Sequence, residues 1–357
     1  MEYSISDRCD MRSKAIKIRD IYIGGGHPVT IQSMTNTDTR DAEATAAQIL
    51  RLEEAGCEIV RFSVYDEDCA AAIPRIKALT HIPLVADIHF DHRLAIAAIE
   101  NGVDKVRINP GNIGSEAKVR ELVACAKDRG IPIRIGVNGG SLEKDILAKY
   151  GVTAEGMVES ALSHAAILER CGFYDIVLSL KASTVKKTVE AYRTARERSP
   201  YPLHLGVTEA GMGEAALVKS AIGIGALLVD GIGDTVRVSM TGDPVQEVYA
   251  AKRILSAAGA RSDGVEIVSC PTCGRTRVDL KSIVEKVEAS LPNANKPLKV
   301  AVMGCAVNGP GEAREADIGI AFGSVNAVVF KKGELMYSDK LPGVIDRFIA
   351  DIRKELE

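Results

Sequence analysis

Long apolar runs are missing from this 357-residue sequence. A helix that spans a bilayer needs ~18 to 20 apolar residues, whereas the longest candidate here, residues 221–229, is short and interrupted by glycines. The N-terminal segment lacks the apolar core of a secretory signal, because charged residues recur from Asp7 to Lys14. These absences predict a cytoplasmic protein.

A strong net charge is also missing. The formal charge is −3, from 45 basic and 48 acidic residues, which argues against a protein that coats nucleic acid or an anionic membrane. Hydrophobic residues make up 46% of the chain, which is ordinary for a globular protein and excludes extensive disorder. The length suits one large domain and a smaller one.

Disulfide bonds are not expected in a reducing compartment, so the eight cysteines are either small buried residues of the core or metal ligands. Five of them stand singly among apolar neighbours and are interpreted as small buried hydrophobes: Cys9, Cys57, Cys69, Cys125 and Cys171. The remaining three cluster near the C-terminus and form a different pattern.

The first 241 residues alternate short β-branched runs with helical stretches. The expected strands are residues 29–34, 58–64, 84–90, 105–110, 133–138, 176–181, 203–209 and 235–241. Eight such repeats predict an α/β fold of the TIM type, a closed (β/α)8 barrel. An open doubly wound sheet is the alternative, but the glycine-rich turn that it normally carries after its first strand is missing here.

Basic residues recur at the same place in several of these strands. Residues two apart on a strand share a face, which predicts one inner ring of cations, Arg61, Arg107, Arg134, Lys181 and Arg237, interleaved with His89, Asn109, Asn138 and Ser239. Such a ring fits a phosphate or diphosphate, which arginine binds bidentately. Two alternatives stay open: ion pairs with Asp87 or Glu209, and arginines that point outward. The direction of Arg237 is the most ambiguous.

A second domain is expected after the barrel. Residues 1–258 form the predicted barrel, 259–264 a polar linker, and 265–357 a small α+β domain with one helix between two strands, then two further strands and a helix. This domain carries Cys270, Cys273 and Cys305, each placed just after a predicted strand or in the turn that follows it.

Three thiolates can hold three irons of a [4Fe–4S] cluster and leave the fourth iron for another ligand. Zinc is the first alternative, but it favours four nitrogen or sulfur ligands, and neither a second C-x-x-C nor a histidine follows Cys273. A redox dithiol is the second alternative and leaves Cys305 unexplained. The fourth ligand could be Glu312, Glu315, substrate or water.

The linker is short for a cluster that must reach the mouth of its own barrel. The last barrel helix spans ~22 Å, and six linker residues reach at most ~20 Å. A head-to-tail homodimer, in which each chain supplies the cluster for the other's barrel, is therefore expected.

Several strings in the sequence resemble one family closely, 4-hydroxy-3-methylbut-2-enyl diphosphate synthase in its short bacterial form. They are QSMTNT at 32–37, DIHF at 87–90, RINPGN at 107–112, TEAGMG at 208–213, GIGDT at 231–235, CPTCGR at 270–275, MGC at 303–305 and NGPGE at 308–312. The resemblance implies reductive ring opening of 2-C-methyl-D-erythritol 2,4-cyclodiphosphate with two electrons, in isoprenoid precursor biosynthesis. It also implies a homodimer and ferredoxin or flavodoxin as electron donor.

The resemblance also implies roles for single residues. The [4Fe–4S] cluster would be held by Cys270, Cys273, Cys305 and Glu312, and Glu209 would be the catalytic acid or base alongside the exchangeable ligand Glu312. The diphosphate would be bound by Arg61, His89, Arg107, Arg134, Asn138, Lys181 and Ser239. Two other functions remain open: a zinc-stabilised phospholigand-binding barrel and a pterin-type methyltransferase barrel.

Overall fold

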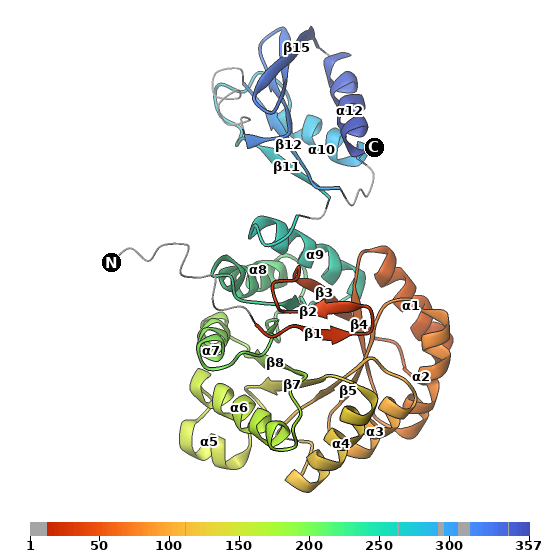
Figure 1. The fold of residues 1–357 in the computed structure, drawn as a ribbon. Coiled ribbons are helices and arrows are strands. Elements are labelled where there is room, and N and C mark those ends of the chain that lie inside the picture. Colours follow the sequence, from red (N-terminus) through yellow and green to blue (C-terminus); the bar gives the residue numbers. More distant parts are fainter. Residues whose placement is uncertain (1–12, 111, 263, 292–295, 306–314, 342) are drawn as a thin grey trace. The chain divides into compact units, whose positions relative to one another are not determined.

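The computed structural model describes residues 13–110, 112–262, 264–291, 296–305, 315–341 and 343–357. The chain divides into two compact units, Met1–Arg261 and Ser262–Glu357, drawn in Figure 1. Among the described residues, no helix is long and apolar enough to cross a membrane.

The first unit is a parallel barrel, as the sequence predicts. Its strands are β3 (Thr30–Met34), β4 (Ile59–Ser63), β5 (Leu84–Ile88), β6 (Lys105–Ile108), β7 (Ile133–Asn138), β8 (Ile176–Lys181), β9 (His204–Leu205) and β10 (Thr235–Val236). They pair in the order β8-β7-β6-β5-β4-β3-β10-β9. A parallel bridge between Leu178 and Leu203 joins the two ends of this sheet, so the barrel is nearly closed.

Helices surround the strands (Figure 1). They are α1 (Ala42–Glu54), α2 (Glu67–Leu79), α3 (His92–Glu100), α4 (Glu116–Arg129), α5 (Lys144–Tyr150), α6 (Ala154–Arg170), α7 (Val185–Arg198), α8 (Gly213–Val229) and α9 (Pro244–Ala257). In the sequence, glycines follow four of these helices, and all four have positive φ: Gly56, Gly102, Gly130 and Gly172. Glycine occupies such positions because a Cβ atom disfavours the left-handed backbone.

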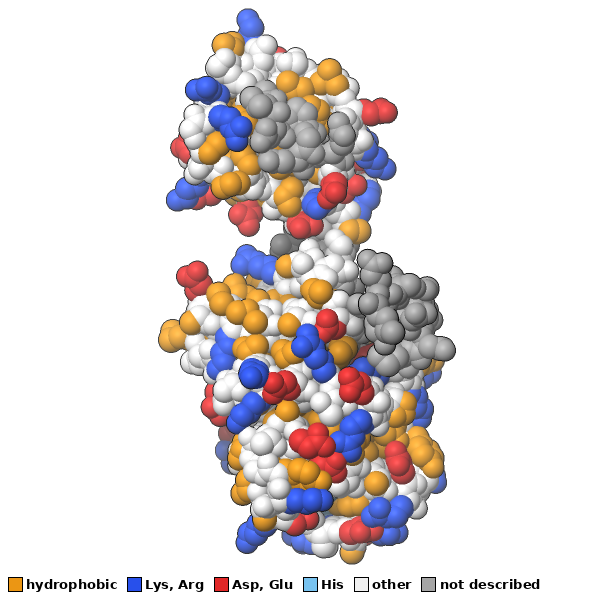
Figure 2. Space-filling view, turned by 90° about the vertical axis from the view of Figure 1, so that its left-hand side faces the viewer, with side chains coloured by type: hydrophobic (Ala, Val, Ile, Leu, Met, Phe, Trp, Pro, Cys, Tyr) orange, Lys and Arg blue, Asp and Glu red, His pale blue; other side chains and the backbone are white. Residues whose placement is uncertain are grey.

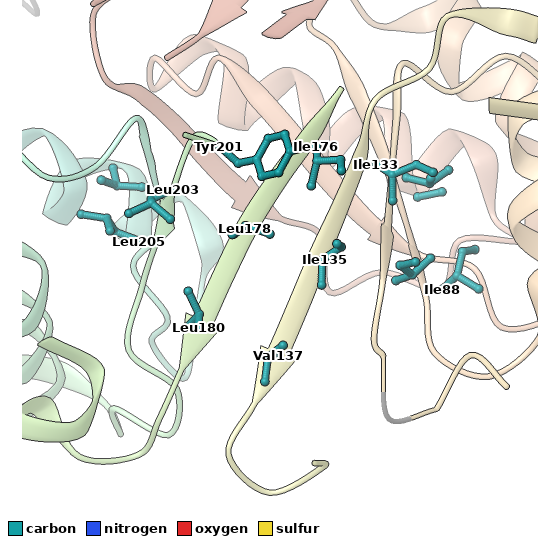
Figure 3. Packing of buried hydrophobic residues seen from close by; sticks show 14 of the residues in the cluster. Ile88, Ile133, Ile135, Val137, Ile176, Leu178, Leu180, Tyr201, Leu203 and Leu205 are labelled. Carbon is teal, nitrogen blue, oxygen red and sulfur yellow. The ribbon is translucent and has the colours of Figure 1, made fainter. Parts of the chain in front are cut away.

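Strand alternation sorts side chains between two environments. Ile133, Ile135 and Val137 of β7 and Ile176, Leu178 and Leu180 of β8 belong to one large apolar cluster shared with the helices (Figure 3). The residues between them, including Arg134 and Ser179, therefore face the opposite side, the barrel interior. Apolar burial thus fixes which face of each strand turns inward.

A short hairpin that the sequence analysis did not predict precedes the barrel. Its strands are β1 (Ile16–Ile18) and β2 (Ile21–Ile23), paired antiparallel. Ile18 and Ile23 pack with Ile59 and Val85, which lie on the inner face of β4 and β5. The hairpin therefore places apolar side chains against the amino-terminal ends of the barrel strands.

Strands β9 and β10 are much shorter than predicted, although they begin at the expected places. The Thr208 N–H donates to the Ala182 carbonyl at 3.4 Å, and the Thr241 N–H donates to the Gly211 carbonyl at 3.0 Å. The segments after both strands therefore bond to neighbouring loops instead of continuing the ladder. The predicted polar strand ends are loops in this part of the barrel.

The described residues of the second unit form a five-stranded mixed sheet and two helices. Its elements are β11 (Val265–Ser269), α10 (Leu280–Ser290), β12 (Leu298–Met303), β13 (Ile318–Phe322), β14 (Asn326–Lys331), β15 (Glu334–Lys340) and α12 (Gly343–Leu356). The strands pair in sequence order, and β11, β12 and β13 run parallel. Three strands follow β12 among the described residues, so the prediction of two was wrong. The third, Glu334–Lys340, is an exposed edge strand, and its apolar residues are consecutive instead of alternating as in a half-buried strand.

Candidate functional site

Most of the predicted ligand-binding residues lie in the carboxyl-terminal halves of the barrel strands or just after them, whereas Arg134, the second residue of β7, lies deeper. Arg61, Arg107, Arg134 and Lys181 lie within β4, β6, β7 and β8, and Asn138 ends β7. His89 follows β5, Glu209 follows β9, and Ser239 follows β10. Since the strands of a barrel are parallel, these ends meet at one mouth, where barrel enzymes carry their active sites.

Asp87 on β5 is the centre of this site. Its carboxylate accepts a hydrogen bond from Arg107 at 3.1 Å and lies 3.7 Å from Arg61 and 3.4 Å from His89 Nε2. Burial alone would raise the pKa of Asp87, but Arg61, His89 and Arg107 hold it well below its usual range. The predicted alternative of ion pairs with Asp87 is therefore correct for Arg61 and Arg107, and it fixes how both guanidinium groups are held.

Arg237 has a separate partner, which the sequence analysis missed. Its guanidinium donates to Glu247 of α9 at 3.1 and 3.0 Å, and Glu247 also accepts from Ser33 Oγ and the Met240 N–H. Glu247 is 3% exposed. No pattern in the sequence marked this residue, because a single glutamate in the first turn of a helix usually faces solvent.

Arg134 and Lys181 add positive charge for which the described residues show no anion. Arg134 is 1% exposed, its Nη1 reaches Gln32 Oε1 at 3.3 Å, and its Nε has no hydrogen-bond partner among the described residues. Burial, followed by Arg61, lowers the pKa of both Arg134 and Lys181 well below the ordinary values. Five cations thus face two buried carboxylates, Asp87 and Glu247, and this surplus suits an anionic ligand.

Two glycines give the long cations their space. A Cβ atom on Gly136 would overlap the guanidinium of Arg107, and one on Gly206 would lie 2.8 Å from Lys181 Nζ. Arg107 also donates to the Gly136 carbonyl at 2.9 Å. Inner-face glycines opposite predicted inner-face cations are a sequence signal that could have strengthened the prediction of the ring.

The polar residues at the rim are more accessible. His89 and Glu209 are exposed, and Asn138 and Ser239 are partly buried. Glu209 has a φ of 53°, an uncommon left-handed backbone for a residue that is not glycine, and its carbonyl accepts from Lys219 at 2.8 Å. Such backbone strain is concentrated at functional sites. Asn109, also predicted, is buried and donates to Ser141 Oγ at 2.9 Å.

Two further buried residues, Lys105 and His204, lie on barrel strands in the interior. Lys105, the first residue of β6, is fully buried, and the two-residue spacing from Arg107 could have identified it. His204 on β9 is also fully buried, and burial followed by Arg134 lowers its pKa well below its usual value.

The three clustered cysteines follow neighbouring elements of the second unit. Cys270 follows β11 and Cys305 comes two residues after β12, and these parallel strands pair from Val265 with Leu298 to Ser269 with Val302. The Gly304 N–H donates to Cys270 Sγ at 3.2 Å. Cys273 is exposed, and hydrogen bonds from the Arg275 backbone and side chain lower its pKa, which favours the thiolate.

These thiols suit a metal centre chemically, and an N–H bond to a cysteine sulfur is typical of iron–sulfur sites. The described residues nevertheless contain no group of three or more His, Cys, Asp or Glu side chains positioned to hold a metal ion. Glu312 lies outside the described residues, so its predicted role stays a prediction. In the first unit, burial raises the pKa of Cys57 to about 12, as expected for an inert filler.

Comparisons with known proteins agree with this two-unit organisation. Residues 13–252 match the family model described as the GcpE TIM-barrel domain, and residues 266–354 match the GcpE protein C-terminal domain. Among curated proteins, the 4-hydroxy-3-methylbut-2-en-1-yl diphosphate synthase (flavodoxin) of Caldanaerobacter subterraneus subsp. tengcongensis is 58% identical over 96% of this chain and 97% of its own. The enzyme of the same name from Geobacillus thermodenitrificans is 54% identical over 97% of this chain and 92% of its own.

A solved structure also matches part of this chain. A dihydropteroate synthase of Yersinia pestis, in a sulfonamide drug complex, has a TM-score of 0.50 at 11% identity and covers 70% of this chain and 100% of its own. At that identity the likeness concerns the fold and carries no functional information.

Proposed function

The chain belongs to the GcpE family of 4-hydroxy-3-methylbut-2-en-1-yl diphosphate synthases, and on that premise we propose that it opens 2-C-methyl-D-erythritol 2,4-cyclodiphosphate reductively to 4-hydroxy-3-methylbut-2-enyl diphosphate. The reaction consumes two electrons and a proton, breaks the carbon–oxygen bond to one phosphate, and releases a hydroxyl group as water. The observation that carries the proposal is the surplus of buried cations at the barrel mouth.

The barrel's own residues bind and orient the diphosphate. Arg134 Nε is buried and finds no acceptor in the part of the chain that the structure describes, so a phosphate oxygen placed there would satisfy a donor that is costly to bury alone. Arg107 is held in place by Asp87 and the Gly136 carbonyl. A ring whose geometry is already set can stabilise charge as it develops on the departing diphosphate oxygen without reorganising.

Glu209 supplies the proton chemistry in this proposal. Its carboxylate stands on the segment after β9, and the Thr241 N–H bonds the Gly211 carbonyl, which joins this segment to the one after Ser239. An exposed carboxylate at the rim of a cationic site can deliver or accept a proton next to a bound polyol.

Cys270, Cys273 and Cys305, with Glu312, would hold a [4Fe–4S] cluster, which supplies electrons one at a time and a Lewis-acidic iron for the substrate oxygen. The donor set fits: three thiols arise at one end of adjacent parallel strands, and the Gly304 N–H already points to Cys270 Sγ. Flavodoxin is the proposed electron donor because the curated relatives carry it in their names; ferredoxin is the alternative.

A homodimer is proposed from an apolar face of the barrel unit. Val218 and Ile222 of α8 are 50% and 56% exposed and line one hollow with Val185, Glu214, Ala215 and Lys219. Figure 2 shows hydrophobic side chains on the side of the molecule that carries α8. An exposed apolar face of this kind typically marks a protein contact. In a two-fold homodimer, the same face of a second copy of the chain would cover it.

Metal analysis and turnover of anaerobically purified full-length protein test the function. We expect brown protein with about four irons and four sulfides per chain, and reductive turnover of the cyclodiphosphate with reduced flavodoxin. Cys305→Ser should lose iron and turnover, whereas Cys125→Ser, a change at a half-buried helix residue, should keep both. Colourless protein with one zinc would contradict the proposal and favour the zinc-stabilised phospholigand-binding barrel.

A further inference from the structure

Lys105 is a fully buried lysine in the barrel interior. It is 0% exposed, and its Nζ has no hydrogen-bond partner among the described residues. Lys105 shares the inner face of β6 with Arg107, two residues further along the strand. Buried lysines are nearly always paired, so this amine needs an explanation that the substrate-binding residues do not provide.

The described residues around Lys105 offer it no negative charge. Its register partner on β5 is Val85, which packs with Ile18 and Ile23 of the N-terminal hairpin. Arg134 of β7 and Arg61 of β4 are the charges that act on it, and the Lys105 charge in turn acts on His204 of β9. The carboxylate of Asp87 on β5 is engaged by Arg61, Arg107 and His89.

These surroundings disfavour an ammonium ion in the empty barrel. Burial, followed by Arg134 and Arg61, holds the pKa of Lys105 well below its usual value. The Nε2 of Gln32 on β3 and the Nε2 of His204 also lack partners among the described residues, so neither of them bonds to the amine. A neutral amine is the state that this environment favours.

A bound diphosphate reverses this balance. Lys105 lies roughly 7 Å along β6 from Arg107, too deep for contact at the mouth but within reach of a dianion's field in a low-dielectric interior. Each phosphorus atom of a cyclic diphosphate carries one ester and one anhydride linkage and a single, strongly acidic hydroxyl, so the ligand itself has no group that titrates near neutral pH. Any proton exchanged on binding therefore belongs to the protein.

We propose that Lys105 is a positioning residue that takes up a proton from solvent when the cyclic diphosphate enters the barrel mouth. The new N–H bond forms at Nζ, and the resulting ammonium adds positive charge beneath Arg107 and Arg134 only when the ligand is present. The inference rests on the proposed function for the identity of the ligand. Lys181 also lies in the interior, but at the end of β8, where it can contact the ligand directly.

Calorimetric titration of the full-length protein with cyclodiphosphate, in two buffers of different ionisation enthalpy, measures the protons taken up. Near pH 8 we expect Lys105→Met to take up about one proton fewer than the wild type. The wild-type Kd should also rise more steeply with pH, by up to tenfold per pH unit. His204→Gln, at a neighbouring buried position, should keep the wild-type uptake. Equal uptake in the wild type and Lys105→Met, or loss of uptake in His204→Gln instead, would overturn the proposal.

A second measurement needs no ligand. If the pKa of Lys105 is lowered in the folded state, the unfolded state binds one more proton than the folded state up to pH ~10.4. The wild-type free energy of unfolding therefore increases as pH rises, and Lys105→Met should lack this increase. Between pH 7 and 9 the wild-type unfolding constant should fall relative to that of Lys105→Met by up to tenfold per pH unit. Lys105→Gln serves if the methionine variant does not fold. Parallel curves would overturn the proposal, whereas absence of cyclodiphosphate binding by wild type would overturn the proposed function instead.

Discussion

Replacing Asp87 with asparagine removes the negative charge that lies among Arg61, Arg107 and His89. Asp87 and Arg107 are 3% and 4% exposed, so the variant leaves buried positive charge without its counter-charge. Breaking a buried ion pair by changing one partner costs about 3–5 kcal/mol. For a unit of this size, each kcal/mol shifts the melting temperature by about 2–4 °C, so the barrel of Asp87→Asn should melt roughly 10 °C lower.

Differential scanning calorimetry, with hydrogen exchange on peptides from β4 to β7, measures this loss in the unit that carries it. The matched control is Asp91→Asn, in the same β5–α3 segment, where the carboxylate is more exposed and caps α3. Asparagine is an equally good cap, and an exposed ion pair contributes at most about 1 kcal/mol. The control should therefore melt near the wild-type temperature.

Two further observations bear on Asp87. Added inorganic diphosphate should recover more stability in Asp87→Asn than in wild type, because it restores a counter-charge to Arg61 and Arg107. The folded pKa of Asp87 lies below the unfolded value of about 3.9, so its contribution is complete above that pH and is lost only as pH falls toward the folded value. A loss below about 1 kcal/mol at neutral pH, or no recovery with diphosphate, would refute the reasoning.

Other variants separate binding, proton chemistry and assembly. Glu209→Gln should lower kcat by about 100-fold or more with little change in substrate Kd, since general acid–base groups contribute that much. The control is Glu197→Gln, a change at an exposed residue of α7. Weaker binding without slower turnover would contradict the assigned role. Arg134→Met should weaken cyclodiphosphate binding in calorimetry by about 30-fold or more. The same change should raise the melting temperature of the ligand-free protein, because it removes an uncompensated buried charge. A lower melting temperature would contradict the role of Arg134 in ligand binding. Ile222→Glu should shift the protein toward the monomer in analytical ultracentrifugation. The control Leu147→Glu, a change at an exposed apolar residue of α5, should leave the oligomeric state unchanged. A wild-type protein that is active as a monomer would disprove the homodimer.

Much of the barrel and of its cation ring could be predicted from the sequence. The alternation of apolar and polar residues along β7 and β8 places Ile133 and Arg134 on opposite faces, and apolar burial decides which face turns inward. Helix ends were marked by glycines that the structure confirms at positive φ. These features depend on residues close in sequence, so local chemistry determines them.

Only the tertiary structure decided how the cations are paired. Arg237 meets Glu247 because α9 packs beside β3, and Asp87 meets Arg107 because β5 and β6 pair with Asp87 opposite Arg107. Lys105 is isolated because its partner on β5 is a valine against the N-terminal hairpin, which no pattern predicted. The charge on a buried side chain depends on which groups the fold brings within a few ångströms of it. Strand alternation therefore determined which residues face inward, and the packing of distant segments determined which of those residues still lack a counter-charge.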